Sequence, residues 1–279
     1  MKILVTGNRG LAGAAIERAL SGRNYDVAGF DRVGGKDIRD PKALSIAMRG
    51  CDAVIHAAAL AGQPEAHPSE IIEVNLLGTW NVLWAAECEG VRRIVYLSSV
   101  NTLGCFIGEK APDYLPIDDD YPCSPGTPYG VSKKLSEEMC KHFTARTGIP
   151  TICLRPPGIF NEARYLEIRK WMEVDPRNEW TPFWEYGAFI DVWDVARAAL
   201  CALECPDPGH ATFLLCAADI VSAEKTTREL VSQIHPGVPW RGGIEYKEDP
   251  YRSLICTERA RKILGWEPVY SWRSGKPRK

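Results

Sequence analysis

The sequence has no long hydrophobic run. No stretch of its 279 residues stays apolar for the roughly 20 residues that a membrane-spanning helix needs. The amino terminus also lacks the succession of basic, apolar and small residues that marks a secretory signal peptide, because charges and glycines interrupt it at once. We therefore expect a cytoplasmic protein without a membrane partner.

The chain also lacks an excess of one charge and any metal-binding pattern. Its formal net charge is −2, which gives no electrostatic reason to expect a nucleic-acid partner. The ten cysteines form no Cys-x-x-Cys pair, and the five histidines lack the spacing of metal ligands. We expect reduced cysteines in the core and no metal site.

What the sequence does have is a regular alternation of apolar and amphipathic segments through its first two thirds. This alternation predicts the α/β class, with a Rossmann-type doubly wound parallel sheet and helices on both of its faces. The carboxyl ends of such strands are where ligands gather. The expected strands are 3–6, 26–31, 53–58, 93–98 and 151–155, and the expected helices are 11–20, 41–48, 69–88 and 129–147.

Three evenly spaced glycines lie between the first expected strand and the first expected helix. Gly7, Gly10 and Gly13 follow the pattern Gly-x-x-Gly-x-x-Gly. Glycines at such a junction allow a tight turn and a close approach to a pyrophosphate, which the positive end of the helix attracts. The sequence therefore predicts a dinucleotide site here.

The second expected strand ends on a carboxylate, Asp31. An acid at this distance from the glycines binds the ribose 2′-hydroxyl of NAD and repels the 2′-phosphate of NADP. Arg9 in the glycine loop and Arg32 next to the acid partly offset that repulsion. We expect NAD as the cofactor and leave NADP open.

A serine pair and a Tyr-x-x-x-Lys pattern point to proton transfer. Ser98 and Ser99 end the fourth expected strand, and Tyr129 and Lys133 lie four residues apart on one helix face. A lysine charge favours the phenolate form and lowers the pKa of the tyrosine, which makes it a general base. The serines also suit a strand cap, and we interpret His56 as a buried structural residue.

With these features in place, the chain resembles the extended short-chain dehydrogenase/reductase family, also named the NAD-dependent epimerase/dehydratase family. The similarity covers nearly the whole length. Further family-like segments are Asp37-Ile38, His56-Ala-Ala58, Asn75-Leu-Leu-Gly-Thr79, Leu154-Arg-Pro156, Phe189-Ile-Asp-Val-Trp-Asp-Val195 and Leu264-Gly-Trp-Glu-Pro268.

The resemblance implies roles for individual residues. Ser99, Tyr129 and Lys133 take the catalytic positions, and Lys133 also binds the nicotinamide ribose. Asn75 takes the place of a scaffold residue near the cofactor. The expected cofactor-binding residues are Gly7, Asn8, Arg9, Gly10, Leu11, Gly13, Asp31, Arg32, Asp37, Ile38, Ala57, Ala58, Asn75, Tyr129, Lys133 and Pro156.

The resemblance further implies hydride transfer between NAD and a hydroxyl carbon, with Tyr129 as base. Val100 and Asn101 replace the Asp-Glu pair of sugar-nucleotide dehydratases, and prolines follow Arg155 where epimerases carry an asparagine. The stretch 98–106 partly resembles uronate dehydrogenases, without their carboxylate-binding arginine in 180–189. We expect an oxidoreductase acting on a small sugar, sugar acid or polyol-like substrate. A sugar or sugar-nucleotide epimerase and a non-catalytic NAD-binding protein remain alternatives.

The family also implies a small, discontinuous carboxyl-terminal substrate lobe. Residues 1–156 and 188–220 would form the dinucleotide-binding core, and residues 157–187 and 221–279 the substrate lobe, within one compact unit. The aromatic residues of 180–189 suit either a lobe core or a substrate wall. Because helices 69–88 and 129–147 pair between subunits in many relatives, we expect a homodimer.

Overall fold

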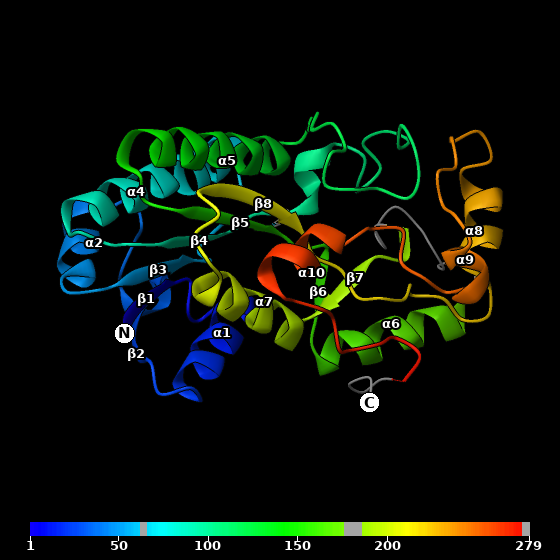
Figure 1. The fold of residues 1–279 in the computed structure, drawn as a ribbon, viewed down its shortest axis with the longest axis horizontal. Coiled ribbons are helices and arrows are strands. Elements are labelled where there is room, and N and C mark those ends of the chain that lie inside the picture. The colour runs from blue at the N-terminus through cyan, green and yellow to red at the C-terminus, as the bar shows by residue number, and fades with distance from the viewer. Residues whose placement is uncertain (62–65, 176–185, 275–279) are drawn as a thin grey trace.

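A six-stranded parallel sheet lies at the centre of the computed structural model, which describes residues 1–61, 66–175 and 186–274 (Figure 1). The strands have the spatial order β2-β1-β3-β4-β5-β8. The chain therefore adds β2 on one side of β1 and β3 on the other, and the strand order reverses between β1 and β3. A crevice opens at the carboxyl ends of strands at such a reversal. The strands are β1 (Lys2–Thr6), β2 (Asp26–Phe30), β3 (Ala53–His56), β4 (Ile94–Leu97), β5 (Thr151–Arg155) and β8 (His210–Leu214).

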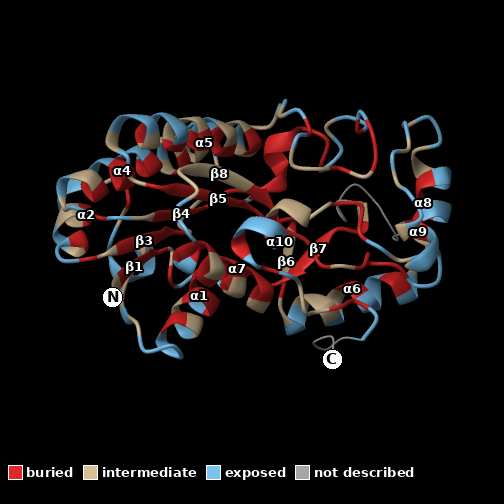
Figure 2. Ribbon diagram, viewed as in Figure 1, coloured by how far each residue is buried: buried red, intermediate tan, exposed pale blue. Residues whose placement is uncertain are grey.

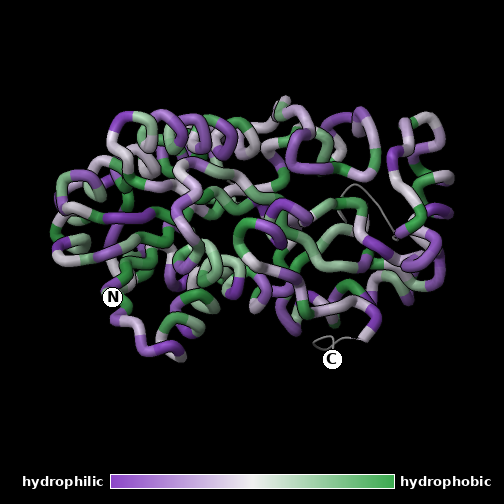
Figure 3. The backbone as a smooth tube through the Cα atoms, in the orientation of Figure 1, coloured by the Kyte–Doolittle hydropathy of each residue, from purple (hydrophilic) through white to green (hydrophobic). Residues whose placement is uncertain are grey.

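Helices cover both faces of the sheet, which confirms the predicted fold class (Figure 1). One layer contains α1 (Leu11–Ser21) and α7 (Val192–Glu204), and the other contains α2 (Pro41–Met48), α4 (Gly78–Cys88) and α5 (Pro128–Thr147). The inner strands β1, β3, β4 and β5 are therefore buried, whereas the outer helix faces are exposed (Figure 2). Hydropathy follows the same division, since hydrophobic residues run along the strands (Figure 3).

The expected helix 69–88 is divided into three parts. A π-helical turn (Glu73–Leu77) separates α3 (Pro68–Ile72) from α4. In this turn the N–H of Gly78 donates to the carbonyl of Glu73, and the hydroxyl of Thr79 donates to that of Asn75. A widened turn leaves the apolar spacing of the sequence nearly unchanged, so the periodicity did not indicate it.

Several elements that follow β5 were not assigned from the sequence. The sixth strand, β8, extends the sheet, and two short strands pair in a separate parallel ribbon. None of the described helices combines the length and the apolar character needed to cross a membrane. The further elements are β6 (Gly158–Phe160), α6 (Glu162–Val174), β7 (Phe189–Asp191), α8 (Thr227–Ile234), α9 (Glu245–Glu248) and α10 (Glu258–Leu264).

A second hydrophobic core lies beyond the carboxyl ends of the strands. It joins apolar side chains of the segment 105–121 to those of α8 and of residues 246–255. Isolated bridges pair Leu115 with Trp240 and Ile117 with Ile255. The division into two lobes stays a prediction. That prediction assigned the segment 105–121 to the dinucleotide-binding core, whereas in the structure this segment packs against the carboxyl-terminal part.

A buried ion pair joins α5 to the end of β5. The guanidinium of Arg155 donates from Nε and Nη2 to the two carboxylate oxygens of Glu137, each at 2.8 Å. Both side chains are at least 95% buried. Burial opposes the guanidinium charge, but the hydrogen-bonded carboxylate outweighs it and raises the pKa of Arg155. The same carboxylate accepts a hydrogen bond of 2.7 Å from Ser98 Oγ, at the end of β4.

We expect Glu137→Gln to lower the free energy of unfolding by about 3–5 kcal/mol, because it leaves the buried guanidinium without a counter-charge. Urea denaturation followed by circular dichroism measures the change. Glu258→Gln is the matched control, since Glu258 pairs with Arg261 on the surface and we expect no measurable effect. Equal effects of the two substitutions would contradict this role of the buried pair.

Candidate active site

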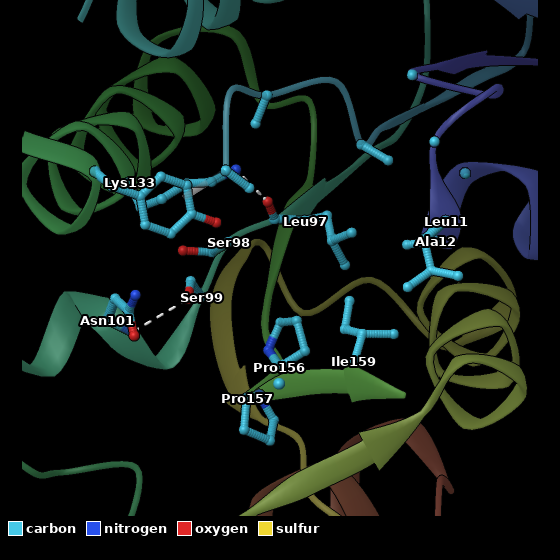
Figure 4. A pocket seen from close by; sticks show the side chains of 18 of the residues that line it. Leu11, Ala12, Leu97, Ser98, Ser99, Asn101, Lys133, Pro156, Pro157 and Ile159 are labelled. Atoms are coloured by element: carbon cyan, nitrogen blue, oxygen red, sulfur yellow. Dashed lines mark hydrogen bonds between the residues drawn. The ribbon is translucent and has the colours of Figure 1, made fainter. Parts of the chain in front are cut away.

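A cavity of about 910 Å³ lies where four strands of the sheet end (Figure 4). Its lining residues follow β1, β3, β4 and β5 and come also from the start of α5. This is the crevice expected for a doubly wound sheet. Of the predicted site residues, the cavity brings together Gly7, Gly10, Leu11, Gly13, Ala57, Ser99, Tyr129, Lys133 and Pro156.

Two of the three glycines, Gly7 and Gly13, leave no room for a side chain. Gly7 has a φ of +72°, and a Cβ there would lie 2.6 Å from the amide nitrogen of Ala58. A Cβ on Gly13 would lie 2.0 Å from the carbonyl oxygen of Gly7. Gly10 is the N-cap of α1 and offers no side chain to its first N–H groups. The start of α1 is therefore suited to an anion such as a pyrophosphate.

A smaller cavity of about 280 Å³ continues from the first one, with which it shares Gly7, Gly10 and Ala57. Asp31 lines it and is held in place by two backbone N–H groups. Its Oδ2 accepts from Arg9 N at 3.0 Å, and its Oδ1 accepts from Val33 N at 2.8 Å. The predicted residues that line this cavity are Gly7, Arg9, Gly10, Asp31, Arg32, Asp37, Ile38, Ala57 and Ala58.

Asp37 is already engaged with a neighbour. Arg39 donates to both of its carboxylate oxygens, with Nη2 at 2.7 Å from Oδ2. These hydrogen bonds lower the pKa of Asp37. The carboxylate is therefore ionised and oriented by Arg39 at the edge of this cavity.

Two other expected cofactor-binding residues do not line either cavity. The amide of Asn8 donates to Glu17 at 3.0 Å. The side chain of Asn75 bonds to both backbone groups of Leu60 and to Ser132 Oγ, at 2.8–3.1 Å. Asn75 thus lies behind the cavity wall and connects the loop after β3 to α5.

Lys133 is held close to the ring of Tyr129. Its Nζ donates to the carbonyl of Leu97 at 2.7 Å and lies 5.8 Å from the ring centroid of Tyr129. The lysine is 2% exposed, and this burial lowers its pKa to about 7. Thr127 caps the helix just before the tyrosine by accepting from Gly130 N at 3.1 Å. The expected Tyr-x-x-x-Lys arrangement is therefore present at the first turns of α5.

The two serines have different surroundings. Ser98 Oγ donates to the buried Glu137, whereas Ser99 Oγ accepts from the N–H of Asn101 at 3.2 Å (Figure 4). Because this bond uses only an acceptor position, the Ser99 hydroxyl keeps its proton for another partner. The geometry thus favours Ser99 over Ser98 for contact with a ligand.

His56 is a structural residue, as the sequence suggested. Its Nδ1 lies 2.7 Å from Thr6 Oγ1, and its Nε2 lies 3.0 Å from Thr79 Oγ1. Burial lowers its pKa to about 3, so it is neutral. Within residues 1–61, 66–175 and 186–274 there is no group of three or more His, Cys, Asp or Glu side chains placed to hold a metal ion.

The aromatic segment 180–189 is only partly described. Tyr186 packs in the second hydrophobic core, and Phe189 packs against Phe160 and Trp272. Neither lines the larger cavity, so for these two residues the core interpretation holds. Residues 180, 183 and 184 of this aromatic cluster lie outside the described residues.

Sequence reasoning missed Thr127, which lines the larger cavity just before the catalytic candidate Tyr129. The helix-capping pattern Thr127-Pro128 was a usable signal. Arg164 also lines this cavity, from α6, although the sequence favoured a surface charge over a substrate contact for it. Its placement depends on how the carboxyl-terminal part packs.

Comparison with known proteins agrees with the geometry of the site. The family described as "NAD dependent epimerase/dehydratase family" matches residues 3–216. The chain belongs to this family. The match confirms the resemblance and the expectation of an enzyme whose family uses NAD.

Individual relatives are distant. A putative UDP-glucose 4-epimerase of Methanocaldococcus jannaschii is 28% identical over 98% of this chain and 95% of its own. A uronate dehydrogenase of Pseudomonas putida is 28% identical over 62% of this chain and 67% of its own. A short-chain dehydrogenase/reductase superfamily protein of Agrobacterium tumefaciens, solved with bound NAD, has a TM-score of 0.71 at 25% identity and covers 98% of this chain and 94% of its own.

We expect Gly13→Ala to weaken NADH binding by about tenfold or more, because the added Cβ would displace the carbonyl of Gly7 and the loop around it. Fluorescence titration with NADH measures the affinity. Gly22→Ala at the other end of α1 is the control, since its Cβ would meet nothing closer than 3.5 Å. An unchanged affinity in the Gly13 variant would show that the loop does not bind the dinucleotide.

Proposed function

We propose that this protein is an NAD-dependent oxidoreductase that removes a hydride from a hydroxyl-bearing carbon of a small sugar, sugar acid or polyol-like substrate. The observation that carries the proposal is that Ser99, Tyr129 and Lys133 line one cavity together with the glycine loop. Proton transfer and dinucleotide binding would then take place in a single continuous space.

The residues around the cavities suit NAD. The N-terminus of α1 would hold the pyrophosphate, and Asp31, already oriented by two N–H groups, would accept hydrogen bonds from the adenosine ribose. Arg9 and Arg32 beside Asp31 would ease the binding of a 2′-phosphate, so NADP is the second cofactor to test. When bound, NAD supplies the nicotinamide ring that accepts the hydride.

The chain's own residues would handle the proton. The phenolate oxygen of Tyr129 takes the proton of the substrate hydroxyl, and the hydroxyl of Ser99 donates a hydrogen bond to the same oxygen. Lys133, held near the ring by the carbonyl of Leu97, favours the phenolate when its own amine is protonated. The hydroxyl carbon becomes a carbonyl carbon as the hydride leaves.

A substrate without a nucleotide fits the residues that follow β5. Asn161, the first asparagine after Arg155, accepts a hydrogen bond from Arg164 N at 3.0 Å as the N-cap of α6. Asn161 does not line the larger cavity, whereas Pro156 and Pro157 do. A diphosphate would therefore lack the asparagine that sugar-nucleotide epimerases place there.

An epimerase is the alternative function. The full-length match to a putative UDP-glucose 4-epimerase favours it. An epimerase would use the same three residues, and the keto intermediate would be reduced again on its other face. A non-catalytic NAD-binding protein is the third possibility, against which the intact Ser99, Tyr129 and Lys133 argue.

The first test is the absorbance of reduced nicotinamide with the purified protein, NAD or NADP, and a panel of aldoses, uronic acids, polyols and sugar nucleotides. Net reduction with a free sugar, acid or polyol would support the dehydrogenase. A changed sugar in the NMR spectrum without net reduction would support the epimerase.

We expect Tyr129→Phe to lower the rate by roughly 10²- to 10⁴-fold, because it removes the proton acceptor but not the ring. The affinity for NADH should stay unchanged in fluorescence titration. Tyr25→Phe is the control, since its hydroxyl bonds to Glu204 at the opposite end of the sheet. Full activity of the Tyr129 variant would remove the tyrosine from the mechanism.

We also propose a homodimer built on α4 and α5, as the family resemblance implies. Trp80 and Trp84 are 46% and 51% exposed on α4, and their rings stack with centroids 6.5 Å apart. A hollow of about 440 Å³ beside them is lined by Leu135 and Met139 of α5. An exposed apolar face of this kind suits contact with the same face of a second copy.

We expect Trp84→Glu to convert the dimer to a monomer, because it introduces a charge into the apolar contact. Size-exclusion chromatography with light scattering measures the mass at micromolar concentration. Trp171→Glu is the matched control, since Trp171 is 42% exposed on α6. A wild-type mass equal to one chain would contradict the dimer.

A further inference from the structure

We propose that Ile107 binds the substrate through an apolar contact, on the C–H surface beside the carbon that reacts. This inference rests on the proposed function and narrows its substrate class to compounds that present uncharged carbon at this place. It assigns part of the choice of substrate to a residue that takes no part in proton transfer.

The first observation is an apolar side chain that lines the cavity and stays accessible. Ile107 lines the larger cavity together with Tyr129, and the residue is 43% exposed. The two residues before it, Cys105 and Phe106, are each 1% exposed and belong to the second hydrophobic core. Because water would leave the accessible surface of Ile107 when a ligand covers it, an apolar contact is favoured there.

The second observation is that the backbone of Ile107 is strained. Ile107 and Gly108 have φ values of +50° and +79°. The N–H of Glu109 donates to the carbonyl of Phe106 at 3.2 Å, which closes a turn around them. Two positive φ angles in such a turn are typical of type I′, whose first central position favours Asn, Asp or Gly. A β-branched residue is unfavourable there, because its Cβ crowds the backbone.

This strain coincides with the cavity. The non-glycine residues with a positive φ in the described part of the chain are Asn24, Ile107 and Tyr186. Of these three, Ile107 is the one that lines the larger cavity. Strained residues persist where the surrounding structure holds them, and they are frequent at active sites and ligand clamps.

The third observation is that the turn is held to the start of α5. Glu109 Oε2 accepts a hydrogen bond of 2.6 Å from the N–H of Gly126, three residues before Tyr129. Gly104 packs on the same loop so closely that a Cβ there would lie 2.0 Å from the carbonyl oxygen of Ser124. The strained turn is therefore fixed on the side of the cavity that contains the tyrosine, where the substrate would react.

An isoleucine side chain is suited to the C–H groups of a sugar or polyol. It offers no hydrogen-bond donor or acceptor, so a hydroxyl or carboxylate directed at it would lose bonds to water without replacement. A substrate that directs its reacting hydroxyl to Ser99 and Tyr129 would present carbon to Ile107. The contact would then favour one orientation of the substrate and limit the group that fits beside the reacting carbon.

The test exchanges side chains between two turns that share the left-handed conformation. Ile107→Asn introduces a residue that tolerates this conformation, so we expect the melting temperature of the cofactor-free variant to be equal to or above that of the wild type. Asn24→Ile is the matched control, because Asn24 has a φ of +60° in an exposed turn after α1. Its melting temperature should fall by about 2–6 °C.

The second arm measures kinetics with the best panel substrate. We expect Ile107→Asn to lower kcat/KM by about tenfold or more, mainly through KM, because the apolar contact is lost in the ground state and the transition state alike. Ile107→Leu, which keeps an apolar side chain of equal size, should stay within about threefold of the wild type. The affinity for NADH in fluorescence titration should be unchanged in both variants. A purely structural residue would not give this difference at undiminished stability.

Three results would overturn the proposal. A melting temperature of Ile107→Asn below that of the wild type would make Ile107 a packing residue. An unchanged kcat/KM in this variant would remove the substrate contact, and a weaker affinity for NADH would assign the side chain to the cofactor. If no panel compound reacts, the proposed function fails, while the melting temperatures and the NADH titration still decide whether Ile107 is structural or contacts the cofactor.

Discussion

The buried Glu137–Arg155 ion pair is the interaction on which the arrangement of the active site depends. Charges in the interior are tolerated only when they are paired, so this pair fixes the position of α5 along the end of β5. Ser98, which directly follows β4, donates a hydrogen bond to the same carboxylate, and Lys133 donates to the carbonyl of Leu97, the last residue of β4. Because Glu137, Lys133 and Tyr129 lie four residues apart on α5, this buried contact also orients the face of the helix that carries Tyr129 and Lys133.

The dinucleotide side of the cavity depends on a different constraint, which is close packing. Gly7 and Gly13 leave no room for a side chain, and this brings the bare N-terminus of α1 against the loops after β1 and β3. Asp31 then receives its orientation from backbone N–H groups of the same region. Steric exclusion and backbone hydrogen bonds, rather than long side chains, shape this half of the site.

The substrate side is assembled from segments that lie far apart in the chain. Residues after β5, the start of α5 and the short helical turn that contains Asn101 all line one cavity. The shared core of the family accommodates epimerases and dehydrogenases, so the fold alone does not select a substrate.

The sequence alone determined what depends on local spacing: the strand and helix alternation, the glycine loop, Asp31 at a strand end, and Tyr129 four residues before Lys133. Each of these follows from backbone geometry within a few residues, which is why each was readable. Tertiary structure decided the rest. It assigned Ser98 to a carboxylate 39 residues away and left Ser99 open, placed Asn75 behind the wall, and packed the segment 105–121 on the carboxyl-terminal part. These outcomes depend on contacts between distant segments, and no local pattern in the chain specifies which polar atom finds its partner and which is left for a ligand.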